Sequence, residues 1–106
     1  MIGSLRHRVV FEQKTQSADD GGGFAESWST LATVFAAVEL DRGQEVVDAG
    51  RVVSANRLRL RIRYRDDVSS ELRVIHKGRV HAIDWVFDPD GKQHWLLVGC
   101  TESMPS

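Results

Sequence analysis

The candidates for nucleophilic catalysis or metal binding in this sequence are one cysteine, Cys100, and four histidines. A nucleophile needs a base and an orienting group. The residues around Cys100 match no nucleophile signature, so we expect a buried or half-buried thiol at a strand end. His76, His81 and His94 lack the closely spaced companions typical of zinc ligands. We therefore predict no enzyme, no metal site and no cofactor, and we interpret His76 and His81 as a surface pair.

Two further motifs have a simpler interpretation than catalysis. The run Gly21–Gly23 is not followed by Lys-Ser or Lys-Thr and does not separate a strand from a helix, so it is not a phosphate-binding loop. Asp66 and Asp67, and likewise Asp88 and Asp90, lie in turn contexts where aspartate caps backbone groups. The glycines indicate a flexible hairpin tip, and the aspartates indicate turns.

The most informative pattern is an arginine series. Between residues 56 and 65 apolar side chains alternate strictly with the residues Arg57, Arg59, Arg61, Arg63 and Arg65. This period of two predicts a strand with one apolar and one basic face. Arginine pairs well with phosphate and with carboxylate, so the basic face is a candidate surface for DNA or for an acidic subunit.

The same basic face has a second interpretation, as a solvated outer face with no ligand. Neighbouring strands then supply the offsetting carboxylates, from Glu12, Glu39 or Glu71.

Three tryptophans, Trp28, Trp85 and Trp95, are a high number for this length. We expect two of them in the core and one at the end of the fold as an interface anchor.

Turn signals divide the chain into short segments rich in valine, isoleucine, threonine and aromatic residues, which indicates an all-β protein. Lys77-Gly78 predicts a two-residue hairpin turn, and Asp88-Pro89-Asp90-Gly91 predicts a type I turn with a bulge. The predicted strands cover residues 7–14, 28–40, 56–65, 72–76, 79–87 and 93–101. Six twisted strands with one apolar face favour a small antiparallel β-barrel, because closure removes exposed edges.

Between the second and third predicted strands lies a segment of fifteen residues, Asp41–Ala55. We interpret it as a long inserted loop, and loops of this length are usually functional or disordered. Its four valines make it too apolar for a simple linker. A helical turn or part of a strand against a partner is an alternative for this segment.

Length and composition limit the possible classes of protein. The 106 residues predict one domain covering 1–106, and a formal charge of −1 shows no overall basic excess. A single cysteine excludes an intramolecular disulfide and favours synthesis in a reducing cytoplasm. No segment has the length or hydropathy of a signal peptide or a membrane span.

The order of features along the chain resembles the phage head–tail joining proteins. The similar segments are Ile2–Glu12, the glycine loop, Trp28, Val34–Val38, Glu45, Ile62–Arg65, Arg79–Ile83 and Leu96–Glu102. The resemblance covers essentially the whole chain and rests on the order of these segments. It implies a structural role in the virion of a tailed phage, a prophage or a gene transfer particle, after synthesis in the host cytoplasm.

Members of this family are small β-barrels known as head-completion, stopper or connector proteins. The resemblance implies a homo-oligomeric ring of six or twelve copies beneath the portal or its adaptor, which closes the DNA exit and docks the tail terminator protein. It also implies that the long loop projects toward the channel. The candidate channel residues are Arg42, Glu45, Val46, Val47, Asp48 and Arg51.

In that setting the arginine strand faces either packaged DNA, bound without sequence specificity, or the acidic surface of a neighbouring protein. The alternative hypothesis from another class is a free-standing nucleic-acid-binding barrel that uses the arginine face. It predicts affinity for nucleic acid with a steep dependence on salt.

Overall fold

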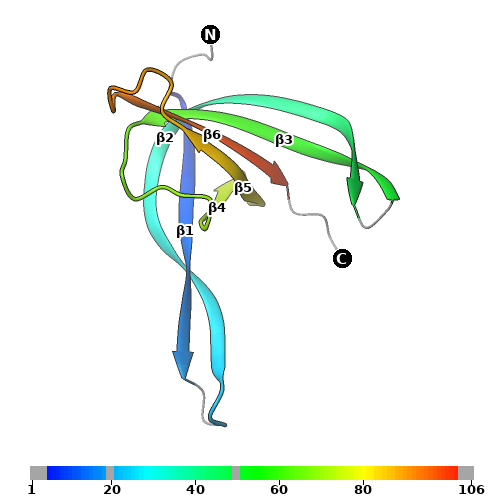
Figure 1. Cartoon of the computed structure of the whole chain (residues 1–106), viewed down its shortest axis with the longest axis vertical. Coiled ribbons are helices and arrows are strands. Elements are labelled where there is room, and N and C mark those ends of the chain that lie inside the picture. The colour runs from blue at the N-terminus through cyan, green and yellow to red at the C-terminus, as the bar shows by residue number, and fades with distance from the viewer. Residues whose placement is uncertain (1–4, 19–20, 49–50, 103–106) are drawn as a thin grey trace.

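The computed structural model shows six antiparallel strands in one sheet that closes into a barrel (Figure 1). It describes residues 5–18, 21–48 and 51–102; side chains are described except at 17–18, 24–25, 41–48 and 51–55. The strands are β1 (His7–Ala18), β2 (Phe24–Asp48), β3 (Arg51–Arg63), β4 (Arg73–His76), β5 (Arg79–Phe87) and β6 (Trp95–Glu102). The predicted all-β barrel of about six strands is confirmed. No helix of the described residues is long and apolar enough to cross a membrane.

Strands follow one another around the barrel in the order β1-β2-β3-β6-β5-β4. The ring closes where β1 pairs with β4, through Val10 opposite Ile75 and Phe11 opposite Val74. The hairpin between β4 and β5 forms as predicted, since Lys77 and Gly78 both have positive φ, 53° and 77°. This closure leaves no long free edge in the body of the sheet.

Inside the barrel lies a core of aliphatic side chains with one phenylalanine, Phe11, and one cysteine, Cys100. The strict alternation predicted for β3 is confirmed, because Leu58, Leu60 and Ile62 are buried. Val68 and Leu72, from the connection between β3 and β4, are also buried and pack into the same core. Burial of these apolar side chains is the main stabilising term of a domain of this size.

The predicted loop Asp41–Ala55 is wrong: this segment is mostly strand. β2 continues to Asp48 and β3 begins at Arg51, and the two pair with each other as far as Asp48 opposite Arg51. β-branched valines favour this pairing, with Val46 opposite Val53 in the register. We call the outer part of this hairpin, Gln44–Asp48 paired with Arg51–Ala55, the arm; residues 49–50 lie outside the described ones.

Several strands begin or end at residues other than those predicted. β1 runs past Lys14, where the predicted strand ends, to Ala18, and Gly21–Gly23 lie between β1 and β2. β2 begins at Phe24 and pairs with β1 up to Ala36, then with β3 from Ala37 onward. Because one long strand serves two partners, two hairpins project from the barrel in different directions (Figure 1).

Candidate interaction surfaces

The arginines of β3 lie on the outside of the barrel, as the alternation predicts. Arg57, Arg59 and Arg63 are exposed and Arg61 is half-buried. Arg65 does not belong to this series, because β3 ends at Arg63. Its guanidinium instead donates two hydrogen bonds, of 3.0 and 2.9 Å, to the carboxylate of Asp67. These hydrogen bonds raise the pKa of Arg65 and lower the pKa of Asp67.

Tryptophans cover part of this outer face, so the prediction that two of them pack in the core is wrong. The guanidinium carbons of Arg61 and Arg63 lie 4.6 and 5.2 Å from the ring centroid of Trp95, which is opposite Arg63 in the register. Opposite residues share a face of the sheet, so Trp95 must point outward with Arg63. Stacked cations stabilise an indole at the surface.

A second stack lies on the β1–β2 side of the barrel. The guanidinium of Arg73 lies 4.3 Å from the ring centroid of Trp28 and donates a 2.7 Å hydrogen bond to the carboxylate of Glu12. Glu12 therefore pairs with Arg73 and not with the arginines of β3. Of the three candidate acids, Glu39 contacts the series, with 4.0 Å between its carboxylate and Arg59.

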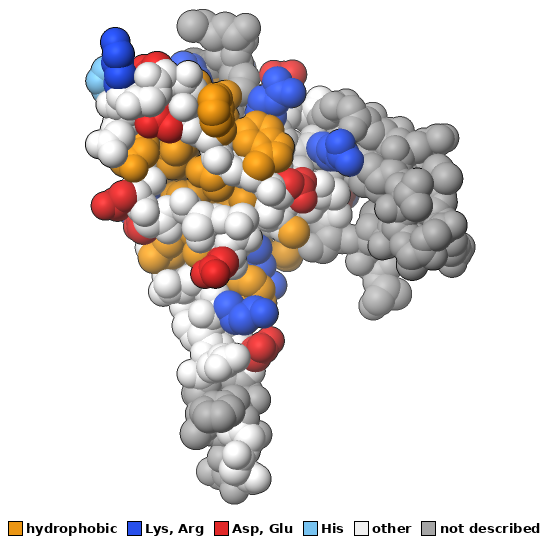
Figure 2. All heavy atoms as spheres, viewed as in Figure 1, with side chains coloured by type: hydrophobic (Ala, Val, Ile, Leu, Met, Phe, Trp, Pro, Cys, Tyr) orange, Lys and Arg blue, Asp and Glu red, His pale blue; other side chains and the backbone are white. Residues whose placement is uncertain are grey.

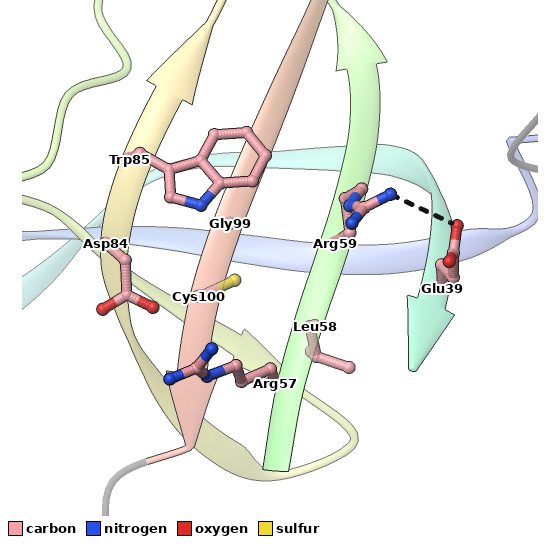
Figure 3. Close-up of a pocket in the computed structure, with 8 residues that line it drawn as sticks. All are labelled: Glu39, Arg57, Leu58, Arg59, Asp84, Trp85, Gly99 and Cys100. Carbon is pink, nitrogen blue, oxygen red and sulfur yellow. Dashed lines mark ion pairs between the residues drawn. The ribbon is translucent and has the colours of Figure 1, made fainter. Parts of the chain in front are cut away.

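Between β3 and β5, across β6, the outer face is hollowed into a groove of about 340 Å³ (Figure 3). We call it the outer groove and define it by the residues Glu39, Arg57, Arg59, Asp84, Trp85 and Gly99. The indole of Trp85 lies over Gly99, its partner in the register, and a Cβ on Gly99 would overlap the ring. Asp84 accepts a 2.6 Å hydrogen bond from the hydroxyl of Thr101.

Sequence reasoning missed this groove, although one signal was present. A glycine within an apolar strand pattern, as at Gly99, marks the close approach of another group. Neither Trp85 nor Asp84 was predicted to face it, because a register shift between Ile83 and Trp85 places an extra residue in β5. Such a shift follows from strand pairing and leaves no trace in the hydrophobic pattern.

One end of the barrel opens into a second cavity, of about 480 Å³, lined by His7, His76 and His81 among others. The ring centroids of His7 and His76 are 5.6 Å apart, and those of His76 and His81 are 6.5 Å apart. His81 is 3% exposed, so the prediction of a surface pair is wrong. Among the described residues no group of three or more His, Cys, Asp or Glu side chains is arranged to hold a metal ion.

Burial is the main effect and lowers the pKa of both His76 and His81. The positive charges of His7 and Lys77 lower the pKa of His76 further. The carbonyl of Arg79 and the carboxylate of Glu102 raise the pKa of His81, but less than burial lowers it. The unfolded chain therefore binds protons near pH 6.5 where the folded chain does not. Stability is intact above this pH and falls as the pH drops below it. We expect the urea midpoint to decrease from pH 7.5 to pH 5.0.

The double variant His76→Gln/His81→Gln should show a smaller decrease than the parent chain. His94 is exposed, so His94→Gln is the matched control and should retain the parent's pH dependence. Equal pH dependence in the parent and the double variant would show that these two groups do not control it.

Cys100 lies in the core, and burial, with a smaller contribution from Asp84, raises the pKa of its thiol to about 12. The thiolate is the reactive form, so this group is unreactive at neutral pH. The prediction of a buried thiol at a strand end is confirmed.

The candidate channel residues all lie in or beside the arm. Glu45, Val46, Val47, Asp48 and Arg51 belong to its paired strands, and Arg42 lies at the register shift between Asp41 and Gln44. Their side chains lie outside the described part of the structure, so their proposed role stays a prediction. The backbone of this segment is extended and paired between β2 and β3, and is not a loop.

Known proteins resemble this chain both in sequence and in fold. The sequence matches the phage head completion protein family over residues 1–103. A chain from the virion of a native gene transfer agent particle has 21% identity and a TM-score of 0.70, with 97% of this chain and 99% of that chain covered. A Shigella flexneri 2a protein solved in solution has 24% identity and a TM-score of 0.73, with 99% and 98% covered. No curated protein matches the sequence.

Proposed function

Because the chain belongs to the phage head completion protein family and is therefore a structural component of a virion, we propose that copies of it form a ring at the head–tail junction. The ring closes the DNA channel after packaging and docks the tail. Its partners are the portal or adaptor protein on the head side and the tail terminator protein on the tail side. The role is structural, without catalysis, cofactor or membrane.

The arm is the observation that best supports this role. Its strands pair only with each other beyond Gln44 and Ala55, and it extends away from the barrel (Figure 1). An isolated two-stranded ribbon is marginally stable in water, so a projecting ribbon gains stability from a surface supplied by an assembly. A ring brings several such arms together around one axis.

In this arrangement the arm reaches the DNA path, and the residues Arg42, Glu45, Val46, Val47, Asp48 and Arg51 contact it or each other. The exposed arginines of β3 are a second candidate surface for packaged DNA. Contact with phosphates there is independent of sequence and sensitive to salt.

We expect a particle-producing strain that lacks this gene to accumulate separate heads and tails, with DNA lost from the heads. Electron microscopy of the particles, with the gene restored in trans as control, measures this. A chain in which residues 44–55 are replaced by Asn-Gly should fold, with the parent's circular dichroism, but should not retain DNA in the heads. Joined, DNA-filled particles from the deletion strain would contradict the proposal.

The competing function is a free-standing nucleic-acid-binding barrel, which the outward arginines of β3 favour. It predicts that the purified protein binds duplex DNA with an affinity that falls steeply between 50 and 200 mM salt. Normal particles in the deletion strain together with this salt dependence would replace the connector role by the nucleic-acid-binding role.

A further inference from the structure

The outer groove has two cations, Arg57 and Arg59, and two acids, Glu39 and Asp84, and the contacts between them are few. Arg57 makes no hydrogen bond or ion pair within the described part of the chain. Arg59 has only a 4.0 Å contact with Glu39, in which both side chains are about half exposed. Asp84 is already the acceptor for Thr101. Beside these guanidinium groups the indole of Trp85 is 42% exposed, so the groove presents two cations and an aromatic surface to a partner.

The turn between β5 and β6 has the complementary character. We call Phe87, Asp88, Pro89 and Asp90 the acidic turn. The side chain of Phe87 is 56% exposed. Figure 2 shows exposed apolar side chains on one face of the barrel. The carboxylate of Asp88 accepts hydrogen bonds from the backbone of Gly91 and Gln93, and that of Asp90 accepts one from Lys92. These bonds orient both carboxylates within the turn that follows Phe87, and the ring of His94 lies 3.5 Å from the carboxylate of Asp90.

A chain cannot place its own acidic turn in its own outer groove. The groove extends from Arg57, opposite Thr101, to Trp85, opposite Gly99, and the acidic turn begins at Phe87, two residues beyond Trp85 on β5. The hydrogen bonds of Asp88 and Asp90 hold the turn beyond the end of β5, so it continues away from the groove of its own chain. The two surfaces meet only when they belong to different copies.

We propose that the acidic turn of one copy docks into the outer groove of the next copy. The carboxylates of Asp88 and Asp90 then face Arg57 and Arg59, and Phe87 packs against Trp85. Because two different surfaces are in contact, the interface is heterologous, and repetition of it closes a ring where the rotation permits. This inference rests on the proposed ring and names the contact that would build it.

A second copy fits this groove better than DNA does. The groove alternates acids, Glu39 and Asp84, with Arg57 and Arg59, so it lacks the continuous positive charge that a phosphate backbone requires, whereas a protein partner can place single charges against individual groups. Tryptophan and arginine are also the residues that most often dominate protein–protein interfaces. The aromatic pair Trp85 and Phe87 has no role in contact with a phosphate backbone.

The first experiment uses disulfide formation between two engineered cysteines that leave all the proposed charges of Arg57, Arg59, Asp88 and Asp90 in place. Glu39→Cys places a thiol in the groove and Pro89→Cys places one in the acidic turn. Cys100 stays as it is, because it is buried. Purified particles and the concentrated free protein, both carrying Glu39→Cys/Pro89→Cys, are oxidised and run on a denaturing gel without reductant.

We expect a ladder of covalent oligomers that ends at the number of copies in the ring and disappears with reductant. The matched control is Gln13→Cys/Pro89→Cys, whose first cysteine lies on the exposed face of β1 and should give no ladder. If the particles contain several copies but the groove pair gives no ladder, the docking inference is wrong while the ring stands. A single copy per particle would overturn the ring itself.

The second experiment exchanges the charges. Arg57→Glu/Arg59→Glu should weaken self-association at least about tenfold in sedimentation velocity, and so should Asp90→Lys. An equimolar mixture of the two variant proteins should recover association, because one groove and one turn in the mixture remain unchanged and the altered pair is again of opposite charge. Lys92→Glu, at an exposed position in the same β5–β6 connection, is the control and should have little effect.

Duplex DNA of 30 base pairs is the competing probe. If Arg57→Glu/Arg59→Glu lowers DNA affinity at least about tenfold and leaves both the ladder and self-association unchanged, the groove binds DNA and the inference is overturned.

Discussion

We expect the substitution Phe11→Ala to lower the free energy of unfolding by about 3–5 kcal/mol. Phe11 is fully buried, and it lies where β1 pairs with Ala32 of β2 on one side and with Val74 of β4 on the other. Removing its ring leaves a cavity at the point where the barrel closes. Domains of this size are stable by about 5–15 kcal/mol, so this single change removes a large share of the total.

Urea denaturation at constant pH measures this effect as a fall in the midpoint at an unchanged slope. Phe35→Ala is the matched control, because Phe35 is 55% exposed on the outer face of β2. Arg8 lies over the ring of Phe35, at 5.6 Å, so we expect the control to change the free energy by no more than about 1 kcal/mol. A loss below about 1 kcal/mol in Phe11→Ala would show that the ring does not fill the core.

The second large effect concerns Gly99. A methyl group at this position overlaps the indole of Trp85, so Gly99→Ala must displace the ring or move the backbones of β5 and β6 apart. We expect a destabilisation of about 1–3 kcal/mol, the usual cost of overpacking. If the cost arises from the indole, Gly99→Ala should have almost no effect in a chain that already carries Trp85→Ala.

The four proteins of this double-mutant cycle give the coupling energy between the two positions. An equal cost of Gly99→Ala with and without the indole would contradict the close approach of Trp85. The same substitution also tests the groove in particles. A displaced indole alters the wall that we propose contacts Phe87 of the next copy, so the disulfide ladder from the groove pair should weaken in the Gly99→Ala background.

The local sequence pattern was sufficient to predict those parts of the fold whose conformation depends on residues close together in the sequence. The period of two in β3 predicted its buried and exposed faces, from Leu58 inward to Arg59 outward, and the Lys77-Gly78 turn predicted the β4–β5 hairpin. In both cases the signal lies within a few residues of chain, where side-chain direction and turn geometry follow from backbone stereochemistry. The family was likewise accessible from the order of such segments.

The candidate site was predicted only in part. The outward arginines were correctly assigned to a surface, but Arg65 was included although the strand ends before it. Asp41–Ala55 was interpreted as a loop because fifteen residues separate two clear strand patterns, whereas in the structure β2 and β3 continue through this segment and pair across a register shift between Asp41 and Gln44. Pairing across a bulge is a property of two strands and is not encoded in either one.

The sequence by itself therefore determined the class of fold, the faces of β3 and the positions of the tight turns. Only the tertiary structure decided that β1 closes on β4, that Trp95 points outward with Arg63, that His81 is buried and that Trp85 lies over Gly99. Each of these depends on contact between residues distant in sequence, such as Glu12 with Arg73, 61 residues apart. Which face of the sheet a side chain occupies follows from register, and register is set when the whole barrel closes.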